Sequence, residues 1–200
     1  PRLVRDIAQA KDKQAELELT GGDSVVDKSL LDQVEACIVQ ILRNAVAHGI
    51  EAPAGRLEAG KPEKGRITID ASNEDRFLIL VIRDDGAGLN YDKIRHRAVE
   101  QGLLPADRAE RLSDQDAAML IFSSGLSTAE DVSMTSGRGV GLDVVAAEVK
   151  RLGGHVAVES QPGRGTAITV RLPLDVTLSV LTGIVAQSGS SRFVVPMASV

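Results

Sequence analysis

The sequence predicts an α+β domain in which helices cover one face of a mostly antiparallel sheet. Segments with strand spacing occur in runs, and the segments with helical spacing are grouped between these runs. A glycine-containing turn at 161–165 separates the last two strands in the pattern of a hairpin. A chain of 200 residues fits one medium domain, or one domain with parts of its neighbours at the ends.

Composition predicts an aliphatic core and excludes several classes of protein. Hydrophobic residues make up 43% of the chain and aromatic residues 2%, and the net charge of -5 argues against a general nucleic-acid binder. The longest apolar run, 77–82, is too short to cross a bilayer, and no leader sequence opens the chain. A single cysteine, Cys37, leaves no internal disulfide and fits a reducing cytosol. We therefore expect a cytoplasmic protein without direct membrane insertion.

The first elements follow from residue spacing. Residues 3–14 are helix-like and charged, and the alternation at 15–19 predicts a strand. Apolar residues recur at intervals of three and four over 29–48, which predicts a long amphipathic helix with Gly49 at its C-cap. A polar loop with Pro and Gly follows at 51–65.

The middle of the chain alternates between strands and short helices. Strands are predicted at 67–71 and 77–83, joined by the polar turn 72–75. The helices that follow are predicted at 92–101, 107–112 and 114–122. The small, polar residues 123–137 predict a mobile loop before the next helix, at 140–152.

The last part of the chain predicts two hairpins. Strands at 155–159 and 166–172 complete the first domain. Beyond Leu174, strand-like segments at 176–187 and 192–195 predict the opening hairpin of a separate β domain.

The first candidate ligand site is Asp84-Asp85-Gly86-Ala87-Gly88, directly after a buried strand. Gly86 and Gly88 allow a ligand to approach the backbone closely. A buried carboxylate can accept a hydrogen bond from the exocyclic amino group of adenine, whereas guanine presents an oxygen there. A simple strand-ending turn is the alternative reading of this motif.

The second candidate is the glycine-rich segment Gly137-Arg138-Gly139-Val140-Gly141, which opens a predicted helix. Free backbone N–H groups at a helix N-terminus favour phosphate. The spacing differs from the dinucleotide-binding fingerprint, and the preceding polar loop predicts a lid that closes over a nucleotide.

The third candidate is a row of polar residues, Gln40, Asn44 and His48, that share one face of the helix at 29–48. An asparagine oxygen can ligate Mg²⁺, which takes few protein ligands. The row could also be a solvated helix edge.

Together these segments resemble the boxes of the GHKL ATP-binding fold in its CheA-type histidine-kinase form. Residues 41–51, ILRNAVAHGIE, resemble the N box, and Asp84 to Gly88 resemble the G1 box. Residues 121–128, IFSSGLST, resemble the F box, and Gly137 to Gly141 the G2 box. The resemblance extends over nearly the whole chain, including the turn 163–166. It implies a two-layer α/β sandwich of the GHKL (Bergerat) type, with a mixed, mostly antiparallel sheet and helices on one face.

The resemblance also implies roles for single residues. Asn44 would hold Mg²⁺, and Gln40 and His48 would complete the catalytic row. Asp84 would receive the adenine amino group with support from Thr166. Glycines would shape the adenine pocket and cradle the triphosphate, namely Gly86, Gly88, Gly137, Gly139 and Gly141. Basic residues would approach the phosphates, namely Lys93, Arg97, Arg138 and, more loosely, Arg43.

The implied function is phosphotransfer from ATP to a histidine on a separate phosphotransfer domain. The implied partners are that domain, a CheW-like coupling protein and a response regulator, and the implied parent protein is a homodimer. The resemblance divides the chain into the end of a dimerisation region at 1–12, the kinase domain at 13–174 and the start of a CheW-like domain at 175–200. None of the three histidines is set like a phospho-acceptor.

Several positions depart from the family pattern. Gln40 stands where CheA-type kinases have His and the wider fold has Glu, so general-base help is absent there. Ser123, Ser124 and Leu126 replace acidic, Pro and aromatic residues of the F box, and Ala47 replaces an acidic residue. A nucleotide-binding pseudokinase scaffold is therefore an alternative function. A GHKL hydrolase is a weaker one, since it would need Glu at position 40.

Overall fold

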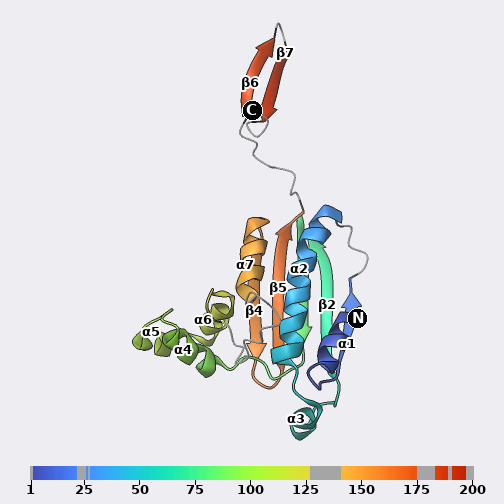
Figure 1. Cartoon of the computed structure of the whole chain (residues 1–200), viewed down its shortest axis with the longest axis vertical. Helices are drawn as coiled ribbons and strands as arrows, with labels where there is room; N and C mark the ends of the chain where they lie inside the picture. Colours follow the sequence, from blue (N-terminus) through green and yellow to red (C-terminus); the bar gives the residue numbers. More distant parts are fainter. Residues whose placement is uncertain are drawn as a thin grey trace.

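A computed structural model describes residues 2–21, 26, 28–126, 141–174, 183–188 and 191–196, the last two ranges by their backbone. The main body is a five-stranded sheet with helices against one face (Figure 1). This arrangement confirms the predicted α+β sandwich. The predicted mobile loop from residue 127 onward and the glycines 137 and 139 lie outside the described residues.

The sheet is mixed, with the strand order β1-β2-β3-β5-β4. The edge strand β1 (Ala15–Thr20) runs parallel to β2 (Gly65–Glu74). The remaining pairs are antiparallel and involve β3 (Phe77–Asp84), β5 (Gly165–Pro173) and β4 (His155–Gln161). The strand β2 is longer than predicted at both ends, and its ladder with β3 extends to the pair Glu74 and Phe77, so residues 72–74 of the predicted turn belong to β2. The strand β3 ends one residue later than predicted, at Asp84.

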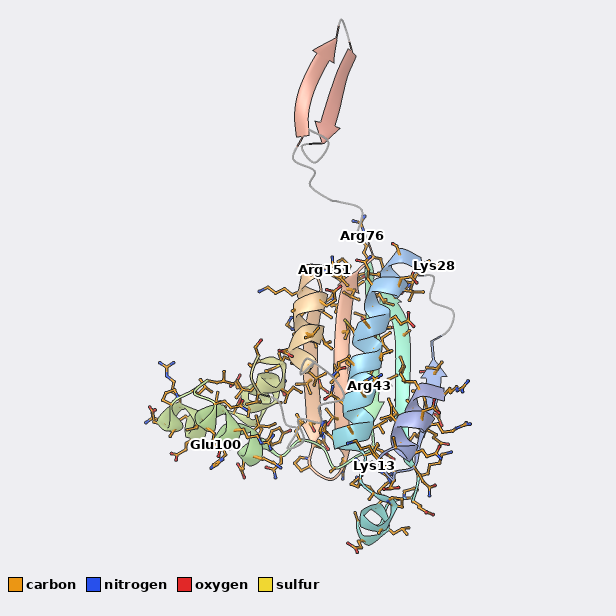
Figure 2. All side chains as sticks on the ribbon, in the orientation of Figure 1. Lys13, Lys28, Arg43, Arg76, Glu100 and Arg151 are labelled. Atoms are coloured by element: carbon orange, nitrogen blue, oxygen red, sulfur yellow. The ribbon has the colours of Figure 1, made fainter. Side chains whose placement is uncertain are left out.

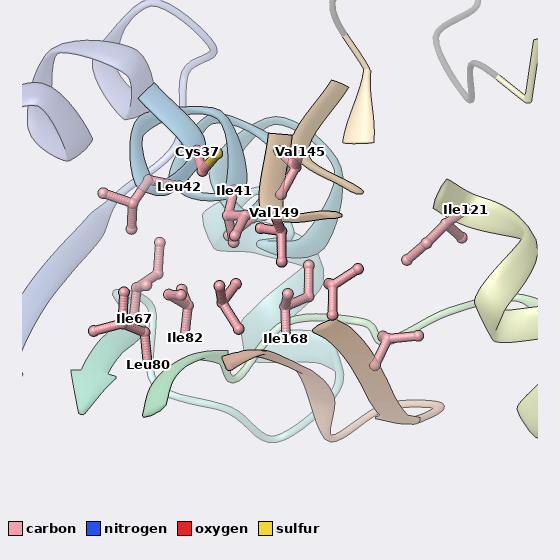
Figure 3. Packing of buried hydrophobic residues seen from close by; sticks show 14 of the residues in the cluster. Cys37, Ile41, Leu42, Ile67, Leu80, Ile82, Ile121, Val145, Val149 and Ile168 are labelled. Carbon is pink, nitrogen blue, oxygen red and sulfur yellow. The ribbon is translucent and has the colours of Figure 1, made fainter. Parts of the chain in front are cut away.

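Helices α1 (Arg2–Gln9), α2 (Lys28–Asn44) and α7 (Leu142–Arg151) pack together over the sheet, and α2 and α7 lie side by side on it (Figure 1). Aliphatic side chains fill the space between the two layers, as Figure 3 shows for Ile41 and Val149 above Ile82 and Ile168. Alternate residues of β3 point into this layer, so that Asp84 continues the row of Leu80 and Ile82. The core therefore ends at a carboxylate.

The structure differs from the predictions at the first helix, which ends at Gln9 rather than at residue 14, and again beyond α2. The predicted helix at 29–48 is α2 followed by a π-helical turn, η1 (Ala45–Gly49), and Gly49 is the last residue of that turn rather than a C-cap. The predicted loop contains a short helix, α3 (Pro53–Glu58), with Pro53 at its first turn. Six residues are too few for a helix that is stable by itself. Tertiary contacts of Arg56, which is completely buried, hold α3 in place.

The short helices of the middle region follow the predictions closely. They are α4 (Tyr91–Glu100), α5 (Ala106–Arg111), α6 (Asp114–Met119) and the 3-10 turn η2 (Leu120–Phe122). The side-chain amide of Gln115 on α6 donates to the carbonyl of Val158 at 3.0 Å, which attaches this group to the edge strand β4. Asn90 caps α4, because its Oδ1 accepts from the backbone N–H of Lys93 at 2.9 Å.

The last two strands form their own sheet. The strands β6 (Gly183–Ser188) and β7 (Ser191–Pro196) pair antiparallel, which confirms the predicted hairpin. Residues 175–182 lie outside the described part, so the predicted start of this hairpin at 176 is not tested. Within the described part of the chain, no helix has the length and apolar character needed to span a membrane.

Candidate nucleotide-binding site

Asp84 is the last residue of β3 and lies opposite Thr166 of β5 in the antiparallel register. Its Oδ1 accepts a hydrogen bond of 2.9 Å from the N–H of Gly86. The backbone N–H of Thr166 also donates to this carboxylate. The sheet and the following turn therefore fix the direction in which the carboxylate points.

The surroundings of Asp84 make its negative charge unfavourable. Burial raises its pKa to about 6, and the charges of Asp85 and Glu51 act in the same direction. The hydrogen bonds from Gly86 and Thr166 oppose this rise without cancelling it. A carboxylate with a raised pKa that ends a buried strand is a typical feature of a ligand site.

The end of η1 packs directly on the turn after Asp84. The carbonyl oxygen of Gly49 accepts a 2.9 Å hydrogen bond from the N–H of Ala87. A Cβ atom on Gly86 would lie 2.1 Å from that same oxygen, and a Cβ on Gly49 would lie 3.0 Å from Asp84 Oδ1. The structure thus brings together the N-box-like and G1-box-like segments, and the missing side chains at 49 and 86 make the approach possible.

Gly88 connects the turn to the hairpin between β4 and β5. Its φ is +73°, and a Cβ there would lie 2.4 Å from the carbonyl oxygen of Gln161. The hydroxyl of Ser160 accepts from the N–H of Leu89 at 2.8 Å and lies 3.0 Å from Thr166 Oγ1. Ser160, which the sequence analysis did not identify, therefore links Thr166 to the segment after Gly88.

Asn44 is the last residue of α2, one turn after Gln40. Its amide nitrogen donates to the backbone carbonyl of Gln40 at 2.9 Å. This hydrogen bond fixes the side chain and does not use Oδ1, the atom suited to a cation. Among the described residues, no group of three or more His, Cys, Asp or Glu side chains could hold a metal. The Oδ1 atom of Asn44 is the atom of this side chain that could ligate a cation.

Positive charges gather around η1. Lys13, which follows α1, lies at the η1 end of α2, and its ammonium group donates to the carbonyls of Val46 and Ala47 at 3.0 and 2.7 Å (Figure 2). Partial burial of the imidazole and the charges of Lys13, Lys11 and Arg97 lower the pKa of His48. The ring is accordingly neutral at pH 7, and an anion bound there would favour its protonation.

The remaining predicted phosphate contacts are only partly described. Lys93 is exposed and Arg97 half-buried on α4, and Arg43 is exposed on α2. Gly141 is the N-cap residue of α7, as expected for a glycine that opens this helix. Gly137, Arg138 and Gly139 lie outside the described residues.

A polar cavity of about 400 Å³ lies beside Asp84 and Thr166. Its other walls come from the β4–β5 hairpin, from β3 and from α6, and include Arg83, Gln115, Glu159, Ser160, Gln161 and Arg164. Asn44 does not line this cavity. The predicted common pocket of Asn44, Asp84 and Gly139 therefore remains a prediction, since residue 139 is outside the described part.

A cluster of charges around the buried Arg56, behind the turn, was missed by the sequence analysis. Arg56 bonds to Glu51 at 3.0 Å and to Asp85 at 2.8 Å, and Lys61 bonds to Glu51 at 2.7 Å. No spacing rule could find this cluster, because its members come from a loop, a short helix and a turn. The only signal was the unusual number of charges in a segment bounded by Pro and Gly.

Comparison with known proteins agrees with this geometry. A family model described as histidine kinase-, DNA gyrase B-, and HSP90-like ATPase matches residues 33–176. The chain is 43% identical over 200 residues to the chemotaxis protein CheA of Klebsiella aerogenes and 38% identical over 200 residues to that of Bacillus subtilis. Each alignment covers 100% of this chain and 30% of the relative, so the chain spans less than a third of their length.

One solved structure shows likeness of fold alone. The blue-light activated histidine kinase of Erythrobacter litoralis EL346 aligns with a TM-score of 0.51 and 16% identity, over 88% of this chain and 41% of that one. Sequence, fold and the packing around Asp84 thus agree, and the chain belongs to the family of histidine kinase-, DNA gyrase B- and HSP90-like ATPases as an ATP-binding catalytic domain of the CheA type.

Proposed function

We propose that this domain binds Mg²⁺-ATP and that its parent protein transfers the γ-phosphate to a histidine of a separate phosphotransfer domain. The observation that carries the proposal is the partly buried, oriented carboxylate of Asp84 beside the end of η1, with cationic side chains around His48. The CheA relatives support the same activity for the whole protein.

In this proposal Asp84 accepts a hydrogen bond from the adenine amino group. Gly86 and Thr166 hold the carboxylate through their N–H groups, and Gly88 keeps the β4–β5 hairpin close to the pocket. Asn44 offers its Oδ1 to Mg²⁺, and the other ligands are phosphate oxygens and water. The phosphates face a glycine-rich helix start and basic side chains, namely Gly137, Gly139, Gly141, Lys93, Arg97 and Arg138, with Arg43 as a further candidate.

The chemistry requires positioning more than proton transfer. An imidazole nitrogen of the acceptor attacks the γ-phosphorus, the bond to the β–γ bridging oxygen breaks, and ADP leaves. Bound Mg²⁺ would neutralise charge on the phosphates. A neutral imidazole is already a nucleophile, so Gln40 can orient groups near the reaction without acting as a base. His48 faces the phosphate charge from the next helical turn.

A second function, a nucleotide-responsive pseudokinase scaffold, is favoured by one observation. The amide side chain of Gln40 cannot act as a general base, so the help that a histidine could give at this position is absent. Both functions need the nucleotide pocket, so they differ only in whether phosphate is transferred.

The wider setting is part of the proposal. We assign residues 1–12 to the end of a dimerisation region, 13–174 to the kinase domain and 175–200 to the start of a CheW-like domain. The partners would be a phosphotransfer domain, a CheW-like coupling protein and a response regulator, and the parent protein would be a homodimer. The free, buried Cys37 fits a cytoplasmic location.

The first prediction separates kinase from scaffold. Mixed with a cognate phosphotransfer domain and radiolabelled ATP, the chain is expected to form acid-labile phosphohistidine slowly. The Gln40→His variant is expected to raise the rate by roughly tenfold or more, because a basic group then stands at this position. Absence of phosphohistidine from both proteins, despite normal ATP binding, would favour the scaffold.

The second prediction concerns base selection. Wild-type protein is expected to bind ATP roughly tenfold to a hundredfold more tightly than GTP, since guanine would leave a buried acceptor unpaired. In Asp84→Asn, the amide can donate to the guanine oxygen, and calorimetric titrations should show this preference lost. Equal affinities for ATP and GTP in the wild-type protein would remove the role given to Asp84.

The third prediction concerns how the stability of Asp84→Asn, relative to that of the wild type, depends on pH in the absence of nucleotide. The folded protein holds the Asp84 proton up to pH of about 6, whereas the unfolded chain releases it near 3.8, so this group lowers stability as pH rises between those values. The free energy of unfolding of Asp84→Asn minus that of wild type should therefore increase by about 2 kcal/mol from pH 4 to pH 7. Urea unfolding at several pH values measures the difference, and a constant difference would contradict the raised pKa.

The fourth prediction compares alanine substitutions at two glycines. Gly86→Ala is expected to weaken ATP binding by roughly tenfold or more, because its Cβ would lie 2.1 Å from the carbonyl of Gly49. Gly55→Ala is the control, since it lies in α3 and a Cβ there meets no atom within 4 Å. Titration of both variants with ATP makes the comparison, and similar affinities for the two would contradict the contact.

A further inference from the structure

Two cations with little or no exposed surface lie behind the turn that follows Asp84. Arg56 is fully buried, and 16% of the Lys61 side chain is exposed. They face two carboxylates, those of Glu51 and Asp85, so the cluster is balanced in charge. Burial raises the pKa of Glu51, but its hydrogen bond and attraction to Lys61 and the charge of Arg56 outweigh burial and lower it overall.

A fully buried guanidinium group has lost its water, and it is stable only where its N–H groups find partners. The carboxylates that face Arg56 keep part of their exposed surface, 20% for Glu51 and 40% for Asp85. The guanidinium group of Arg56 donates hydrogen bonds to three residues. Its Nε donates to the carbonyl of Pro62 at 2.8 Å, and its Nη atoms donate to the carboxylates of Glu51 and Asp85. These directional bonds fix positions that apolar packing would leave loose.

Lys61 directs its hydrogen bonds mainly at the turn. Its ammonium group donates to the carbonyl oxygen of Asp85 at 2.9 Å and to that of Gly86 at 2.7 Å. The third N–H donates to Glu51 Oε1 at 2.7 Å. All three donors of the ammonium group are thus used.

The carbonyl of Asp85 and the N–H of Gly86 belong to the same peptide unit. That unit is trans and planar, so its carbonyl and its N–H point in opposite directions. Lys61 and the Nη1 of Arg56, at 3.2 Å, hold the carbonyl end. The N–H end donates to Asp84 Oδ1. Holding one end of this peptide therefore aims the other end at the Asp84 carboxylate.

We propose that Lys61, together with Arg56, is a positioning residue for base recognition: it orients the peptide unit that hydrogen-bonds Asp84 and thereby sets the preference for adenine over guanine. The inference rests on the proposed role of Asp84. It assigns a specific task to the segment 51–64, which otherwise only connects η1 to β2.

The test compares two lysines of the same segment. Lys61→Met removes the three hydrogen bonds and keeps the aliphatic stem, and Arg56 remains to pair with Glu51. Lys64→Met is the control, because Lys64 is half exposed and pairs with Glu16 on the surface. For each protein, calorimetric titration gives the dissociation constants of Mg²⁺-ATP and Mg²⁺-GTP, and thermal unfolding checks the fold.

The ratio of GTP to ATP dissociation constants is expected to fall about tenfold in Lys61→Met, through weaker ATP binding, and to stay within about twofold of wild type in Lys64→Met. A ratio unchanged from wild type, including the case in which the binding of both nucleotides weakens equally, would show that Lys61 only stabilises the loop. If Lys61→Met does not fold, Lys61→Gln carries the same comparison. The wild-type ratio tests Asp84 separately, so a failure of the proposed function is distinguishable from a failure of this inference.

Discussion

The close contact between Gly49 and the turn after Asp84 constrains much of this domain. The carbonyl of Gly49 accepts from Ala87, and no side chain fits at position 86 beside it. Because α2 and η1 must end at this point, the sheet and the helical layer are joined at the candidate site as well as through the aliphatic core. The segment 51–64 must then fold back from η1 to β2, and its buried cations occupy the space behind the turn.

The charges at the two ends of the site suit an adenine nucleotide. Around Asp84 the charges of Asp85 and Glu51 are balanced by Arg56 and Lys61, so the Asp84 carboxylate itself favours an uncharged base that offers an amino donor. Around His48 the environment is cationic, with Lys11, Lys13 and Arg97, so phosphate is favoured. These two environments are joined by η1, and π-helical turns of this kind occur frequently at functional sites.

Periodicity predicted the two-layer fold and most elements, because the buried face of an amphipathic helix or of a strand appears in the sequence as a regular spacing of apolar residues. The site was predicted where glycine marks a close approach, as at Gly86 and Gly88. It was missed where the interaction joins distant segments. From the sequence, Arg56 has the pattern of a surface charge in a polar loop. Its burial follows only from the contact between α3 and the turn after β3 in the structure. The π-helical turn was missed for a local reason, since its hydrogen-bond spacing differs from that of an α-helix by a single residue.

The central claim is that one carboxylate reads the base while an asparagine side chain helps to hold the metal. A crystal structure of this domain with Mg²⁺ and a non-hydrolysable ATP analogue tests it most directly. The account predicts the adenine amino nitrogen at about 3 Å from an Asp84 oxygen and Asn44 Oδ1 at about 2.1 Å from the metal. An adenine amino group that faces no oxygen of Asp84 would contradict it.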